Sequence, residues 1–108
     1  MNEAFFMPIF QQIESSSLVK LRVQFYKLSV RYAQVRASWN FKSIEEMAED
    51  NSERTILHNT LIDSVNILAR NMEKIGEDVT WRTKLGNDRK VIGDLACYVA
   101  AWLGIRQR

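Results

Sequence analysis

A run of carboxylates between residues 45 and 53 is the part of the sequence best suited to chemistry. Its members are Glu45, Glu46, Glu49, Asp50 and Glu53. On a helix, side chains four residues apart share a face, so pairs from this run could hold one divalent cation. Acidic residues also favour the first turn of a helix without any ligand, because the helix dipole is positive there. We therefore expect no metal site and keep the cation site as an alternative.

The segment 45–49 has the pattern Glu-Glu-x-x-Glu, which resembles the first half of the metal site in the all-α nucleoside-triphosphate pyrophosphohydrolases. In that family a Glu-x-x-Asp pair on the next helix completes a Mg²⁺ site. The candidate pair here is Asp63-Ser64-Val65-Asn66, in which Asn66 replaces an acid and would ligate more weakly. The resemblance covers only residues 45–66 and implies Mg²⁺-dependent nucleotide hydrolysis as an alternative function. Its metal ligands would be Glu45, Glu46, Glu49 and Asp63.

A polar stripe along residues 59–70 is the second candidate site. Asn59, Asp63, Asn66 and Arg70 recur every three or four residues, so on a helix they can contact one another. Asn and Asp are poor helix formers, so in the middle of a helix we expect a specific interaction that accounts for them. Either the stripe is exposed with local pairing, or it meets polar residues of the last helix in a pocket or network. If the chain has a catalytic site, we place it on Asp63, Asn66, Arg70 and Asp94.

His58 and Cys97 are the only histidine and the only cysteine. On a helix His58 lies on the apolar side, between Leu57 and Leu61 in angle, which is typical of a buried, hydrogen-bonded histidine. A zinc site would lack the usual second histidine or thiol. One cysteine also excludes an internal disulfide, and nothing near Cys97 supports a Cys–His nucleophilic pair.

Basic residues on the segment 18–39 form a third candidate site, for phosphate contacts. They are Lys20, Arg22, Lys27, Arg31 and Arg36, with Arg106 and Arg108 near the end of the chain. On a helix they fall in two sectors instead of one stripe, and the net charge of the chain is only +2. Weak nucleic-acid binding is therefore a second alternative, and we do not expect a nucleic-acid partner.

The opening of the chain is strongly apolar, with five large apolar side chains in the six residues 5–10. The segment 18–39 also carries two apolar stripes on different sides of its helix, one through Phe25 and one through Val23. A helix with two apolar sides lies at the centre of its domain or is shared with a second subunit. We expect an oligomer or partner surface made of aromatic residues. These are Phe5, Phe6, Phe10, Phe25, Tyr32 and Trp39.

The elements that must position these residues are helices. Apolar residues recur at three- and four-residue intervals, and few turn residues interrupt them, since the chain has four glycines and one proline. We expect helices over residues 8–14, 18–39, 53–75 and 88–103, with a short acidic helix before residue 50 and one or two turns at 80–85.

Capping residues set the expected ends of these helices. Ser43 with Glu46 forms a capping box, and a break at Asp50–Ser52 precedes a restart. Asp88 caps the last helix, whereas Gly76 and Gly104 are expected stops. The small residues of the last helix, spaced by four, allow close approach of a neighbour: Gly93, Cys97 and Ala101.

The totals fit one all-α domain over residues 1–108, an irregular bundle of three long helices with short N-terminal and connecting helices. Apolar residues make up 46% and charged residues 26% of the chain, as in ordinary globular proteins. The longest apolar run, 95–105, is about half of a membrane span. An acid near the start, Glu3, is atypical of a signal peptide, so we expect a cytoplasmic protein.

The apolar helix faces favour a protein-interaction module over an enzyme. They are more numerous than one small bundle easily buries, so we expect the chain to bind itself, as a homodimer or larger, and possibly another protein. We expect no cofactor, and Mg²⁺ belongs only to the alternative function.

Overall fold

Five helices make up the described part of the chain, which confirms the all-α expectation. The computed structural model describes residues 3–39 and 44–106, with side chains over 3–38 and 53–104, and contains no strand in these ranges. The helices are α1 (Glu3–Glu14), α2 (Val19–Trp39), α3 (Ile44–Lys74), α4 (Thr80–Leu85) and α5 (Arg89–Arg106). None of the described helices is both long enough and apolar enough to cross a bilayer.

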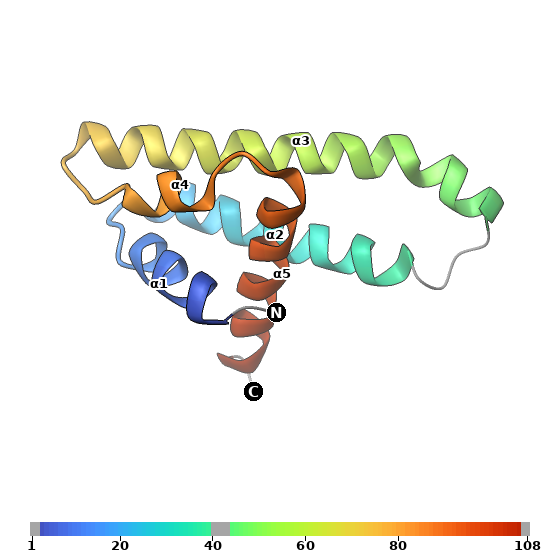
Figure 1. Ribbon diagram of the computed structural model, residues 1–108, viewed down its shortest axis with the longest axis horizontal. Helices are drawn as coiled ribbons and strands as arrows, with labels where there is room; N and C mark the ends of the chain where they lie inside the picture. Colours follow the sequence, from blue (N-terminus) through green and yellow to red (C-terminus); the bar gives the residue numbers. More distant parts are fainter. Residues whose placement is uncertain (1–2, 40–43, 107–108) are drawn as a thin grey trace.

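The helices α2 and α3 form an antiparallel pair along the longest dimension of the molecule (Figure 1). Helix α5 runs across this pair, and α1 and α4 cover the end of the pair away from the α2–α3 connection. The C-terminal part of α2 and the N-terminal part of α3 project beyond α5. The molecule is elongated as a result, with extents of 47 × 29 × 24 Å.

Two helix ends agree with the capping signals in the sequence. After α3, Gly76 has a φ of +80°, and the N–H groups of Gly76 and Glu77 donate to the carbonyls of Glu73 and Met72. This is the Schellman pattern, which satisfies carbonyls that the helix leaves unpaired. At the start of α5, Asp88 Oδ1 accepts the Lys90 N–H at 2.9 Å, as an N-cap does.

Three expected helix ends are wrong. Helix α1 begins at Glu3, so Pro8 lies inside it; the carbonyl of Ala4 then lacks its N–H donor, but both residues are exposed to water. Helix α3 has no break at Asp50–Ser52, because such residues cost only tenths of a kcal/mol, ~0.5 each, against a cooperative helix. Likewise α5 continues past Gly104 to Arg106. Ser43 lies outside the described residues.

Most of the aromatic residues expected at a partner surface are part of the chain's own core. Phe6, Phe10, Phe25 and Tyr32 are each at most 6% exposed, enclosed by the other helices of the same chain. Phe5 is half-buried with its ring 5.1 Å from that of Phe6. The side chain of Trp39 lies outside the described residues. These four buried rings cannot contact a partner, so any interaction surface must use other residues.

The crossing of α5 over α2 depends on the absence of a side chain at Gly93. A Cβ built there would lie 2.6 Å from Tyr32 Oη and 3.0 Å from Tyr32 Cζ. Tyr32 is itself buried, at 6% exposure, so its ring has little room to retreat. The small residue expected at a close helix contact is thus confirmed at this position.

Replacing Gly93 by alanine should destabilise the protein although alanine is the better helix former. We expect Gly93→Ala to lower the free energy of unfolding by about 1–3 kcal/mol, as overpacking does. The matched control is Gly104→Ala in the same helix, where nothing lies within 4 Å of the added Cβ; it should raise stability by about 0.5–1 kcal/mol. Urea unfolding measures both, and equal stabilisation by the two variants would contradict the close contact.

Candidate functional site

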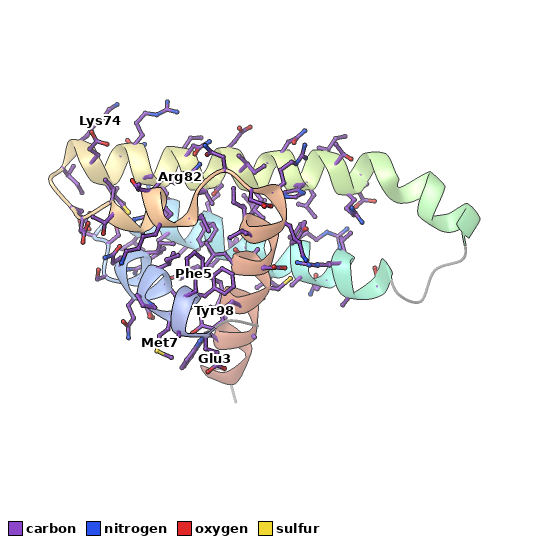
Figure 2. The ribbon with its side chains drawn as sticks, in the orientation of Figure 1. Glu3, Phe5, Met7, Lys74, Arg82 and Tyr98 are labelled. Carbon is purple, nitrogen blue, oxygen red and sulfur yellow. The ribbon has the colours of Figure 1, made fainter. Side chains whose placement is uncertain are left out.

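One residue of the polar stripe of α3, Asn66, helps to hold the segment that connects α4 to α5. Asn66 Oδ1 accepts a hydrogen bond from Arg82 Nε at 2.9 Å. The same guanidinium donates to the carbonyl of Gly86 at 2.6 Å and to Asn87 Oδ1 at 2.9 Å. Figure 2 shows Arg82 on α4 beside α3. Burial lowers the pKa of Arg82, but an arginine remains charged, so these bonds compensate a half-buried cation.

The other members of the stripe have different surroundings. Asn59 Oδ1 accepts from Arg89 Nη2 at 2.9 Å, which ties α3 to the first turn of α5. Asp63 and Arg70 are exposed. Asp94 instead pairs with Arg36 of α2 at 2.7 Å. Two members of the stripe, Asn59 and Asn66, therefore hold α5 and α4 against α3, and the proposed group of four residues is not brought together.

The residues of the alternative metal site are spread along one helix. The side chains of Glu45, Glu46 and Glu49 lie outside the described residues, but their backbone belongs to α3, as does that of Asp63. Since a helix rises 1.5 Å per residue, Glu49 and Asp63 are about 21 Å apart along its axis. The family that the pattern resembles places its two halves on neighbouring helices, so this geometry does not assemble that site. Among the described residues, no group of three potential ligands is close enough to hold a metal ion.

Three of the five basic residues of α2 have partners within the chain. Arg22 donates to the carbonyls of Glu14 and Ser16, where it closes the turn between α1 and α2. Arg31 forms an ion pair with Glu53 at 3.0 Å, and Arg36 pairs with Asp94. For the other two, Lys20 and Lys27, the described residues provide no ion pair. A continuous phosphate-binding stripe on α2 is therefore not formed.

His58 is half-buried between α2 and α5. Its Nε2 lies 2.9 Å from the carbonyl oxygen of Arg89, so Nε2 carries the hydrogen and Nδ1 is the atom that takes up a second proton. Its ring packs on Tyr32 with centroids 5.3 Å apart. The partner of His58 is thus a backbone carbonyl, whereas Cys97 Sγ lies 3.6 Å from Arg36 Nη1.

Burial is the main influence on the charge of His58, and it lowers the pKa of the imidazole. The hydrogen bond to the Arg89 carbonyl acts in the opposite direction. The guanidinium groups of Arg89, Arg54 and Arg36 lower the pKa further by repelling the imidazolium charge. The net result is a histidine that is harder to protonate in the folded chain than in the unfolded chain.

An apolar groove between α2 and α5 is the described surface best suited to a partner. The hollow measures about 480 Å³, and its apolar lining comes from Val23, Tyr26 and Val30 of α2 with Ala100 and Leu103 of α5. Val19 and Val23 extend this strip along α2, 54% and 40% exposed. We call this surface the α2–α5 groove. It contains the second apolar stripe that the sequence placed on this helix.

The rim of the α2–α5 groove is basic. Lys27 and Arg31 line the hollow itself, and Lys20 lies beside Val19 and Val23 where the strip continues along α2. Arg31 is the member already paired, with Glu53. The groove thus combines an apolar floor with a positive edge.

Glu77 is a structural residue that sequence reasoning missed. Its carboxylate accepts hydrogen bonds from the Ser16 hydroxyl at 3.1 Å and from the backbone N–H of Ser17 at 3.1 Å. These bonds join the α1–α2 turn to the α3–α4 turn, about sixty residues away along the chain. No local pattern in the sequence could identify an acceptor so distant along the chain.

No protein-family model, curated protein or solved structure matches this chain.

Removing the Asn66 carboxamide should cost more stability than removing another polar group of the same stripe. Asn66→Ala leaves the half-buried Arg82 without one acceptor, and we expect the free energy of unfolding to fall by about 1.5–3 kcal/mol. The control is Asp63→Ala, an exposed position where we expect a change within about 0.5 kcal/mol. Urea denaturation compares the two, and an equal cost would mean that the hydrogen bond to Arg82 contributes nothing specific.

The folded protein should lose stability as the pH falls from 7.5 to 5.5. Because the pKa of His58 is lowered on folding, the unfolded chain binds this proton more readily, near its ordinary pKa of about 6.5. The loss therefore begins near that value and stops once the pH is below the folded pKa. His58→Gln keeps an N–H donor but does not titrate, so its unfolding free energy should change less over this range. Identical pH profiles for the two proteins would refute the lowered pKa.

Proposed function

We propose that this chain is a non-enzymatic protein-interaction module that self-associates through the α2–α5 groove. One observation carries the proposal, namely the continuous apolar strip formed by Val19, Val23 and the floor of the groove. Among the described residues, the other exposed large apolar side chains are Ile56 and Ile67 of α3 and Ile75 directly after it. Isolated apolar residues are ordinary on protein surfaces, whereas a contiguous strip with a polar rim is typical of interaction sites.

The rim charges favour a helix with acidic flanks as the occupant. Symmetric pairing of two α2 helices would bring Lys20 and Lys27 of both copies together, which like-charge repulsion opposes. The same chain offers the complementary charge, since five of its thirteen acidic residues lie between positions 45 and 53. This segment is in the end of α3 that projects beyond α5 (Figure 1). We therefore favour a head-to-tail contact, which closes into a ring or continues as a chain of subunits.

The polar residues support a structural role over a catalytic one. Asn59 and Asn66 are engaged with Arg89 and Arg82, and Asp94 is engaged with Arg36. Their hydrogen bonds hold the connector and the crossing helix in place. Chemistry at these groups would require breaking contacts that position α5.

A charged residue at the centre of the strip should abolish association. We expect the wild-type protein to be dimeric or larger at tens of micromolar, and Val23→Glu to be monomeric, because the interface would have to desolvate a carboxylate. The matched control is Ile67→Glu, since Ile67 has nearly the same exposure as Val23, 43% against 40%, but lies on α3 outside the groove. Light scattering after gel filtration measures the mass.

Two further outcomes decide the proposal. A wild-type protein that remains monomeric at these concentrations would overturn self-association. A head-to-tail contact also predicts that Lys27→Glu and Glu49→Lys variants, each impaired alone, associate when mixed, because one normal groove then meets one normal acidic end. If mixing restores nothing while wild type still associates, the acidic segment is not the occupant.

A further inference from the structure

A second hollow lies between α3 and the first turn of α5, and it differs from the α2–α5 groove in being basic. It measures about 390 Å³ and is lined by Arg54, Thr55, His58, Arg89 and Lys90. Within the described part of the chain, this lining has three cations, an imidazole and a hydroxyl, and no carboxylate. None of its lining residues belongs to the groove, so the chemistry of this hollow does not depend on self-association.

Hydrogen bonds fix the side of the hollow formed by α5. Arg89 donates from Nη2 to Asn59 Oδ1 at 2.9 Å, which orients its guanidinium along α3. The carbonyl of the same residue accepts from His58 Nε2 at 2.9 Å. The imidazole and the guanidinium are thus held in a defined relation before any ligand arrives, which lowers the entropic cost of binding.

Three described carboxylates that are near the hollow in sequence have partners of their own. Glu53 pairs with Arg31, and Asp94 pairs with Arg36. Asp88 Oδ1 accepts backbone N–H groups at the start of α5, from Lys90 at 2.9 Å and from Val91 at 3.4 Å. None of these three carboxylates belongs to the lining of the hollow.

We propose that this hollow binds a phosphate group of a small molecule. Arginine guanidinium groups recognise phosphate oxygens through paired hydrogen bonds, and a lysine adds a point charge. The volume is near the lower limit of small-molecule pockets, which run from about 300 to 1,000 Å³, so the ligand is compact.

His58 makes the binding measurable. Its imidazole faces Arg54 on α3, Arg89 on α5 and Arg36 on α2, all of which oppose its protonation, while Tyr32 of α2 packs on its ring. A bound dianion would offset this repulsion and favour the imidazolium, so the pKa of His58 should rise. Because the chain has one histidine, its ring resonances report this pKa without assignment ambiguity.

The test is an NMR pH titration of His58 with and without inorganic pyrophosphate, with sodium chloride keeping the ionic strength constant. We expect pyrophosphate to raise the pKa of His58 and to bind saturably. Lys90→Gln and Arg89→Gln should each raise the dissociation constant by about tenfold or more, because each variant loses one charge-assisted hydrogen bond. The control is Arg70→Gln, which removes the same charge from an exposed position of α3 outside the hollow.

The controls separate a built site from general charge attraction. Variants at Arg89 and Lys90 that bind as tightly as Arg70→Gln would overturn the proposal, as would a His58 response that follows ionic strength alone. A short DNA duplex is the competing phosphate source. Retention on DNA without any response to pyrophosphate would also overturn the proposal, because the hollow would then serve a polynucleotide.

Discussion

The contact between Tyr32 and Gly93 sets the arrangement of α5 against the rest of the molecule. A helix that crosses another closely needs a position without a side chain, and Gly93 provides it under the Tyr32 ring. The three described hollows that involve α5 adjoin this crossing: the α2–α5 groove, the basic hollow beside His58, and a hollow of about 720 Å³ that contains Arg36, Asp94 and Cys97. A shift of α5 would therefore change all three surfaces together.

Polar side chains complete what the apolar core leaves unspecified, namely the path of the chain between α4 and α5. The apolar contacts of Trp81 and Leu85, which are 0% and 3% exposed, anchor α4 but cannot fix a loop whose backbone groups need partners. Arg82 supplies them by bridging Asn66 to the Gly86 carbonyl. Asn66 has a low helix propensity, but it lies in the middle of α3 because its side-chain amide accepts a hydrogen bond from Arg82.

Features that depend on a few neighbouring residues were predictable from the sequence. The glycine stop at Gly76, the aspartate cap at Asp88 and the short turn of α4 are all satisfied within five residues. The continuity of α3 through Asp50–Ser52 was not, because weak local preferences lose to the cooperativity of a long helix. Periodicity also placed Phe25 on an apolar stripe of its helix. It could not determine whether the same chain or a partner would bury that stripe.

The distribution of positive charge indicates which kinds of binding partner suit this surface. The guanidinium groups of Arg22 and Arg82 donate hydrogen bonds to backbone carbonyls of the same chain. Binding a ligand there would require these bonds to break. Two other groups of cations lie apart from each other, one at the rim of an apolar groove and one in a compact hollow, and the two share no lining residue. A polynucleotide needs a continuous track of phosphate contacts. Separated groups of this kind fit two different partners better: an acidic helix, whose apolar side enters the groove, and a small anion enclosed between α3 and α5.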